Sequence, residues 1–217
     1  YRTRIDDANF SIALEFAPGG PPVLQGDAGF SRKGPHERQA SYYYSRPQLG
    51  VSGSVGIEGR GVRVDGVAWL DHEWSTEILD PAADGWDWVG LNLDDGTALM
   101  AFRIRRRDGG GLWSHARWID ATGTAATDPA LADAVPRFTT ARSWTSPRTG
   151  ARYPVAMTLA VGPRTLTLEP LFDDQELDAR GSAGTVYWEG AVRVLEADRE
   201  IGRGYLELTG YAGALRM

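Results

Sequence analysis

The feature that most constrains the fold of this chain is a recurring alternation of apolar and polar residues in short segments bounded by Gly, Pro, Asn or Asp. In residues 9–16, for example, every second residue is Phe, Ile or Leu. A period of two is typical of a β-strand with one buried face. The pattern predicts an all-β fold of antiparallel strands, either a barrel or a sandwich. The expected strands cover approximately residues 9–16, 40–45, 49–57, 61–70, 86–93, 98–105, 112–119, 137–145, 154–161, 164–171, 185–195 and 203–211.

Turn and cap residues separate these strands. Asp94-Asp95-Gly96 predicts a hairpin, because Asp-Gly is a favoured pair in tight turns. Pro47 is expected to end the strand at 40–45, since proline cannot donate a hydrogen bond to a neighbouring strand. Residues 121–135 are the best place for a short helix, with Thr127 or Asp128 as its cap before a proline.

Composition and charge exclude several classes of protein. The chain has 217 residues, enough to bury a core without cross-links, and it has no cysteine, which excludes disulfides and thiol nucleophiles. Its net charge of −6 argues against a nucleic-acid partner, and the one basic cluster, at residues 103–107, is interpreted as a solvated strand end. No apolar run is long enough to span a membrane. Because the chain starts at Tyr1 without an initiator Met or a signal peptide, we expect any N-terminal targeting region to lie outside it.

Tryptophan is concentrated in one stretch of the chain. Four of the eight tryptophans fall within residues 66–75 and 85–90, around Asp71 and His72. A carboxylate among indole rings is either a paired structural anchor or a group with a shifted pKa at a working site. In a regular strand Asp71 shares a face with Trp69, and His72 lies on the opposite face.

A set of sequence blocks in a fixed order carries a family resemblance. The blocks are Gly29-Phe-Ser-Arg-Lys-Gly34, Ala40-Ser-Tyr-Tyr-Tyr-Ser-Arg-Pro47, Ala68-Trp-Leu-Asp-His-Glu-Trp-Ser75, Gly85-Trp-Asp-Trp88, Asp94-Asp-Gly-Thr-Ala-Leu-Met100, Tyr187-Trp-Glu-Gly190 and Gly204-Tyr-Leu-Glu-Leu-Thr-Gly-Tyr211. Together they resemble the AttH-like and carotenoid 1,2-hydratase (hydroxyneurosporene synthase) family over nearly the whole chain.

The resemblance implies two lipocalin-like β-barrels of the calycin type in tandem. Family members carry a Glu-Trp-Trp-Tyr block and further strands ahead of the region seen here. We therefore expect residues 1–107 to form the later part of a first barrel, incomplete in this chain, and residues 108–217 to form the second barrel.

The resemblance also implies a role for Asp71. In the hydratases the corresponding Asp is the acid that protonates a carbon–carbon double bond, and aromatic faces stabilise the carbocation. Their His-x-Trp pair on the preceding strand is replaced here by Tyr42-Tyr-Tyr44, so Tyr42 and Tyr44 are the candidate catalytic partners. If Asp71 is the acid, we expect it in a cavity beside Trp69 and one of these tyrosines, with a raised pKa. The alternative is a structural Asp bonded to backbone amides.

The remaining candidate residues are expected to line a ligand cavity, with core packing or surface ion pairs as the alternative. They are Trp69, His72, Trp74, Trp86, Trp88, Tyr187, Glu189, Tyr205 and Glu207. We expect no metal, because His36 and His115 have no ligand-like spacing to His72. We also expect no cofactor, since no phosphate-binding glycine loop or dinucleotide motif is present.

Three functions are consistent with these observations. The first is a lipocalin-like protein of the cell envelope or periplasm that binds an apolar, lipid- or isoprenoid-type molecule. The second is a hydro-lyase of the carotenoid 1,2-hydratase type, or a related cyclase, acting on such a molecule through Asp71. The third is a structural envelope protein with filled barrels.

Overall fold

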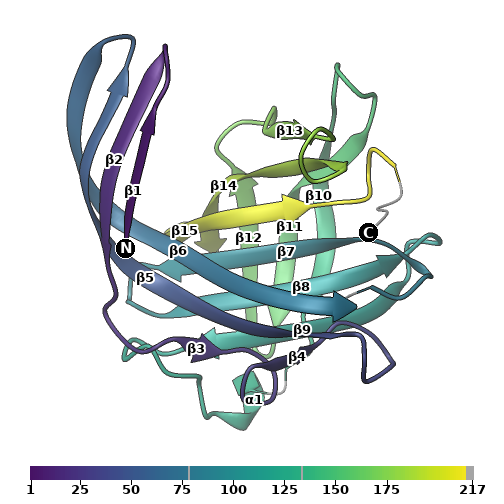
Figure 1. Ribbon diagram of the computed structural model, residues 1–217. Coiled ribbons are helices and arrows are strands. Elements are labelled where there is room, and N and C mark those ends of the chain that lie inside the picture. Colours follow the sequence, from purple (N-terminus) through teal and green to yellow (C-terminus); the bar gives the residue numbers. More distant parts are fainter. Residues whose placement is uncertain (78, 133, 214–217) are drawn as a thin grey trace.

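Two antiparallel β-sheets make up the molecule. The computed structural model describes residues 1–77, 79–132 and 134–213, and nearly all regular structure in this part of the chain is strand (Figure 1). The prediction of an all-β antiparallel fold is therefore confirmed, and the curled sheets are consistent with a lipocalin-like fold. Within the same residues, no helix is long and apolar enough to cross a bilayer.

The first sheet is built around the hairpin of β5 and β6. Its strands are β1 (Arg2–Asp6), β2 (Phe10–Ala17), β3 (Val23–Leu24), β4 (Phe30–Arg32), β5 (Ala40–Ile57) and β6 (Arg60–Glu77). The sequence predicted that Pro47 would end this strand, but β5 continues through it. The register with β6 shifts between Arg46 and Leu49, and Gln48 takes a φ of 51°, so the strand bulges at the proline and continues.

The second sheet contains all later strands. They are β7 (Ala83–Leu93), β8 (Ala98–Arg106), β9 (Gly111–Ile119), β10 (Arg137–Thr145), β11 (Arg152–Val161), β12 (Arg164–Pro170), β13 (Glu176–Ala179), β14 (Thr185–Glu196) and β15 (Arg199–Leu208). Their order is β10-β11-β12-β14-β15-β7-β8-β9, with β13 beside β14. The expected boundary after residue 107 falls between β8 and β9, which pair side by side in this sheet. The division into two barrels remains a prediction.

The predicted hairpin turn and helix cap are found where they were expected. β7 and β8 are joined by the Asp-Asp-Gly turn, in which Gly96 has a φ of 84° and the Leu93 amide donates to the Thr97 carbonyl at 2.9 Å. The one helix in the described residues, α1 (Pro129–Ala132), follows Asp128, whose carboxylate accepts from the Ala130 amide at 2.9 Å. Asp128 is therefore the cap.

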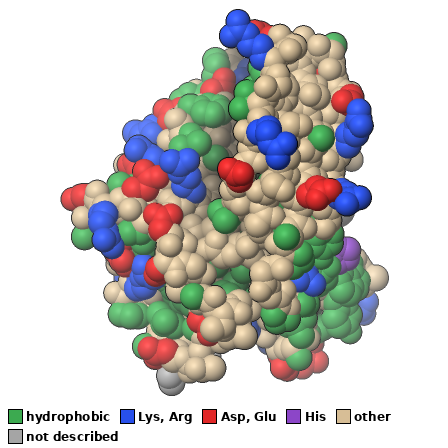
Figure 2. All heavy atoms as spheres, turned by 90° about the vertical axis from the view of Figure 1, so that its left-hand side faces the viewer, with side chains coloured by type: hydrophobic (Ala, Val, Ile, Leu, Met, Phe, Trp, Pro, Cys, Tyr) green, Lys and Arg blue, Asp and Glu red, His purple; other side chains and the backbone are tan. Residues whose placement is uncertain are grey.

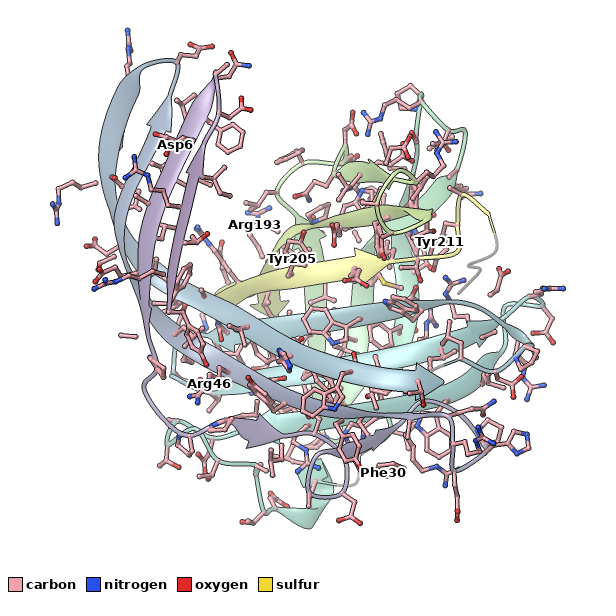
Figure 3. The ribbon with its side chains drawn as sticks, in the orientation of Figure 1. Asp6, Phe30, Arg46, Arg193, Tyr205 and Tyr211 are labelled. Carbon is pink, nitrogen blue, oxygen red and sulfur yellow. The ribbon has the colours of Figure 1, made fainter. Side chains whose placement is uncertain are left out.

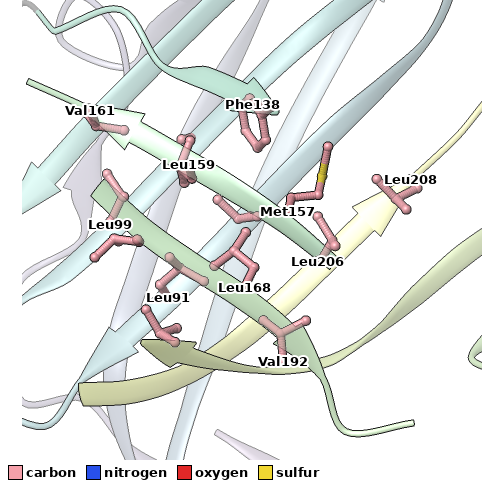
Figure 4. Close-up of a cluster of buried hydrophobic side chains, with 14 of the residues drawn as sticks. Leu91, Leu99, Phe138, Met157, Leu159, Val161, Leu168, Val192, Leu206 and Leu208 are labelled. Atoms are coloured by element: carbon pink, nitrogen blue, oxygen red, sulfur yellow. The ribbon is translucent and has the colours of Figure 1, made fainter. Parts of the chain in front are cut away.

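The main core lies on the concave face of the second sheet. Leucine, valine and methionine side chains from β7, β8, β11, β12, β14 and β15 meet there (Figure 4). Leu91, Leu99, Leu159, Leu168 and Leu206 are among the side chains with no exposed surface. Full burial of each such side chain stabilises the fold by about 1.5–3 kcal/mol, so this sheet is the rigid part of the molecule.

The first sheet packs on the second sheet with one end only. Tyr43 and Trp69 contact the buried side chains of Met100 and Phe102 on β8. The Gln48 amide donates to Asn92 Oδ1 at 2.9 Å and further ties β5 to β7. Toward β1 and β2, the other ends of β5 and β6 stand away from the second sheet (Figure 1). The two sheets therefore diverge, and the candidate site lies where they part.

The basic cluster at residues 103–107 is not a solvated strand end throughout. Arg103 and Arg105 point inward and donate through Nε to the fully buried carboxylate of Asp87, at 2.5 and 3.0 Å. Tyr211 Oη donates to the same carboxylate at 2.9 Å. A buried charge of this kind requires paired partners, and alternate residues of β8 supply them.

Candidate functional site

A pocket of about 610 Å³ opens between β6 of the first sheet and β7 and β15 of the second. Its walls combine indole and phenol rings with carboxylates. The lining residues are Tyr43, Val67, Ala68, Trp69, Asp71, Glu73, Trp86, Trp88, Gly90, Asn92, Arg203, Gly204, Tyr205 and Glu207. Tyr205, labelled on β15 in Figure 3, belongs to the wall that the second sheet provides.

Strand alternation explains which side chains face this pocket. On β6, Trp69, Asp71 and Glu73 are two residues apart and point to the same side. On β5, Tyr43 pairs with Glu73 and Ser45 pairs with Asp71, so these two residues share that side. The alternation of β7 and β15 contributes the opposite wall in the same way.

Asp71 is held by three side-chain donors. Tyr43 Oη donates to Oδ2 at 2.9 Å, while Ser45 Oγ and Trp69 Nε1 donate to Oδ1 at 2.6 and 2.8 Å. No Lys or Arg in the described residues forms an ion pair with it. Burial raises the pKa of Asp71 to about 6, although the three hydrogen bonds act in the opposite direction. The carboxyl therefore gains or loses a proton near neutral pH.

Tyr43 connects Asp71 to the rest of the site. Its hydroxyl oxygen accepts from Trp88 Nε1 at 3.1 Å while its proton goes to Asp71. Burial raises the pKa of Tyr43 well above its usual value, so the hydroxyl stays protonated and remains a donor. Behind its ring, Lys33 Nζ lies 4.6 Å from the ring centroid and forms an ion pair with Glu73 at 2.8 Å.

Glu207 provides a second carboxyl on the opposite wall. Trp86 Nε1 donates to its Oε1 at 2.5 Å. Burial, reinforced by the negative charges of Glu189 and Asp71, raises the pKa of Glu207 to about 7. Two carboxyl groups that titrate near neutral pH therefore line one pocket, a pattern that occurs at sites of proton transfer.

Two tryptophans form a corner of the pocket. The rings of Trp69 and Trp88 meet edge to face, with centroids 6.2 Å apart and an interplanar angle of 77°. Gly90 lies beneath both rings, where a Cβ would come within 2.5 Å of Trp88 and 2.9 Å of Trp69. The absence of a side chain at residue 90 lets the two rings take this arrangement.

Four candidate residues lie on the other face of the first sheet. Tyr42 pairs with Trp74 and Tyr44 pairs with His72, and each pair stacks, with centroids 5.7 and 5.4 Å apart. The expectation that Tyr42 or Tyr44 would lie beside Asp71 is therefore wrong, because both lie an odd number of residues from Ser45 and so point to the opposite face of β5. Figure 2 shows hydrophobic side chains and a histidine gathered low on the right of the face it views.

The other candidates divide between the pocket and its surroundings. Trp69, Trp86, Trp88, Tyr205 and Glu207 line the pocket with Asp71. Tyr187 and Glu189 lie one strand further, on β14, where Glu189 pairs with Glu207 but does not reach the lining.

Several residues of the site were not among the sequence candidates, and those that contact Asp71 or its partners are Tyr43, Ser45, Glu73 and Lys33. Tyr43 was not a candidate, because the resemblance to the His-x-Trp pair points to its two neighbours, Tyr42 and Tyr44. Strand alternation alone favours Tyr43. Ser45 pairs with Asp71, and Tyr43, two positions from Ser45, points to the same face. Ser45 follows from the same rule. Lys33 lies outside any regular strand, and its place in the block at residues 29–34 is the only sequence signal that includes it.

The arrangement suits acid–base chemistry on an apolar molecule. Indole and phenol faces can stabilise a cation, and the two carboxyls can give and take protons. Among the described residues, no group of three or more His, Asp or Glu side chains is placed to hold a metal ion.

Comparisons with known proteins agree with this architecture. A crystal structure of an AttH homologue from Nitrosomonas europaea, described as putative, matches 97% of this chain with 51% identity and a TM-score of 0.89. The chain spans 65% of the length of that protein. Kievitone hydratase from Nectria haematococca matches 98% of the chain, and 64% of its own length, with a TM-score of 0.74 at 18% identity, which shows a shared fold. A comparison with curated protein sequences finds no match.

The model of the AttH-like family matches residues 1–211, almost the whole chain. The blocks that carried the resemblance include the strands that build the pocket, β5, β6, β7 and β15. The chain belongs to the AttH-like family.

Proposed function

We propose that this pocket binds an apolar molecule with a carbon–carbon double bond and adds water to it by acid catalysis. The observation that carries the proposal is the position of Asp71, a carboxyl that lines the pocket, forms no ion pair among the described residues and accepts hydrogen bonds from Tyr43 and Trp69. The fold shared with kievitone hydratase supports the same class of reaction. The substrate we propose is of lipid or isoprenoid type.

Each proton in the proposed step has a donor and an acceptor. The Asp71 carboxyl gives its proton to one carbon of the double bond, and the neighbouring carbon becomes a cation. The ring faces of Trp69 and Trp88 stabilise this cation. Water adds through its oxygen, and its surplus proton passes to the carboxylate of Glu207. Exchange between the two carboxyls and solvent restores the starting state, and the net reaction is alkene plus water to alcohol.

The two carboxyls act as a coupled pair in this scheme. Their pKa values of about 6 and about 7 place the form that holds one proton between these two pH values. In that form the proton resides on Glu207 about ten times more often than on Asp71, and the fraction with the proton on Asp71 supplies the acid and the base together. We therefore expect a bell-shaped pH profile with its maximum between about pH 6 and about pH 7, with activity lost on the acid side for lack of a base and on the alkaline side for lack of an acid.

Isotope incorporation tests the reaction. The purified protein is incubated with geraniol or squalene in water enriched in oxygen-18, and products are analysed by mass spectrometry. We expect labelled alcohol from the wild type, and a loss of about 10²–10⁴-fold in the Asp71→Asn variant. Asp65→Asn, also on β6, is the matched control and should keep full activity.

Binding without chemistry is the second candidate, favoured by the aromatic lining of the pocket. If an apolar molecule co-purifies with the protein and no labelled alcohol forms from either substrate, the hydration proposal fails and the binding function stands.

A further inference from the structure

The carboxyl groups of the pocket exceed its cations. Asp71 and Glu207 line it, and in the described part of the chain neither forms an ion pair. Glu73 is neutralised by Lys33 at 2.8 Å. Arg203 reaches the rim, but its guanidinium is paired at 3.2 Å with a carboxylate of its own strand and its side chain is 72% exposed. Once ionised, neither carboxylate has an ion-paired Lys or Arg in the part of the chain that the structure describes, and Asp71 is attracted only through space by the Lys33 ammonium, which is paired with Glu73.

Tryptophan rings line the same pocket beside these carboxyls. The indole N–H groups of Trp69 and Trp86 are turned toward Asp71 and Glu207, which fixes the orientation of both rings. Trp88 closes the corner against Trp69. Aromatic faces attract cations, and among aromatic side chains tryptophan does so most strongly, above all at sites shielded from water. Unpaired carboxylates and tryptophan faces thus favour the same kind of ligand.

We infer that the pocket between β6 and β15 recognises apolar organic cations, such as tertiary ammonium or quaternary ammonium groups carrying hydrocarbon substituents. The ring faces of Trp69 and Trp88 hold the charged head, and Asp71 and Glu207 supply its counter-charge. A neutral molecule of the same shape fills the space but leaves the carboxylates unpaired, so it binds less well.

This inference deepens the proposed function, because hydration of a double bond places a carbocation among the same rings. To this extent the inference rests on the proposed function. In the bound complex, the ammonium group occupies the position of the cationic carbon. Binding of an ammonium ion nevertheless requires no turnover, so the two ideas can fail separately.

A pair of probes that differ only in charge tests the inference. Benzyltrimethylammonium and neopentylbenzene have the same shape, with nitrogen in the first replaced by carbon in the second. Each is titrated into the wild-type protein at pH 8 and constant salt, with tryptophan fluorescence and isothermal calorimetry as readouts. We expect the ammonium ion to bind at least about tenfold more tightly than the neutral probe.

Two variants distinguish the effect of the pocket carboxylate from the effect of the protein's overall negative charge. Glu207→Gln should weaken ammonium binding by about tenfold and leave the neutral probe within about twofold, since only the charge at the pocket is lost. Glu58→Gln, an exposed carboxylate in the β5–β6 turn, makes the same chemical change and should alter neither affinity. Near-ultraviolet circular dichroism verifies that both variants keep their packing.

The outcomes have distinct meanings. Equal or tighter binding of the neutral probe, or no binding of either probe to the wild type, overturns the inference. An equal loss of ammonium binding in Glu58→Gln and Glu207→Gln also overturns it, because the attraction then comes from net charge. Ammonium binding without labelled alcohol from geraniol or squalene supports the inference and removes the hydration proposal. If labelled alcohol forms but the ammonium probe binds no better than the neutral probe, the hydration proposal stands and this inference fails.

Discussion

At the scale of single residues, Glu207 should make the stability of the folded protein depend on pH. Its pKa is about 7 in the fold against an ordinary value of 4.5, so the folded state binds more protons than the unfolded state between these two values. Stability therefore falls as pH rises through this window. Urea unfolding at pH 5 and pH 8 should show that Glu207→Gln removes about 1–3 kcal/mol of the decline.

The matched control is again Glu58→Gln, which should show the same decline as the wild type. A Glu207→Gln variant with an unchanged pH dependence would mean that this carboxyl is not protonated in the fold. For Asp71 the pH range in which stability declines is lower, from about pH 4 to about pH 6, and Asp71→Asn should remove the decline in that range.

At this scale the sequence could show to which side of its strand Asp71 points, but not which residues of other strands lie near it. Alternation along residues 67–73 predicted that Asp71 would lie with Trp69 and apart from His72, and the structure places them so. It could not show that Glu207 lines the same pocket as Asp71, because this depends on how two separate sheets approach each other. Tyr43 depended on the register between β5 and β6, which a bulge at Pro47 also affects.

At the scale of elements, Gly90 on β7 controls the shape of the pocket. In a Gly90→Ala variant the added Cβ must displace the rings of Trp88 and Trp69, which it would approach to 2.5 and 2.9 Å. Overpacking of this kind costs about 1–3 kcal/mol. We expect a matching loss of stability in urea and at least about tenfold weaker binding of benzyltrimethylammonium. Gly66→Ala on β6, where nothing lies within 4 Å of the added atom, should change neither.

The elements themselves were largely predictable from local signals. Alternation located most strands, Asp-Asp-Gly located the β7–β8 hairpin, and Asp128 with Pro129 located the helix. Their ends were harder to predict. β5 continues through Pro47 because a bulge absorbs the proline, a solution that local propensity does not reveal.

At the scale of the whole molecule, the sheets have unequal roles. The second sheet encloses the large apolar core, while the first sheet meets it over a smaller cluster around Tyr43 and Phe102. A rigid wall and a partly free wall thus border the pocket. This division could not be read from the sequence, since strands of both sheets show the same alternation and only the pairing of β15 with β7 assigns residues 83–119 to the second sheet.

The buried carboxylate of Asp87 should be decisive for the stability of that rigid wall. It joins β7 to β8 through Arg103 and Arg105 and to the segment after β15 through Tyr211. Asp87→Asn leaves two inward-pointing guanidinium groups without a counter-charge, and breaking a buried ion pair in this way costs about 3–5 kcal/mol. Thermal and urea unfolding should show this loss, whereas Asp178→Asn, which breaks an exposed pair with Arg180, should change stability little. Equal stability of the two variants would show that the arginines turn out to solvent at little cost, and the second sheet would then owe its rigidity to apolar packing alone.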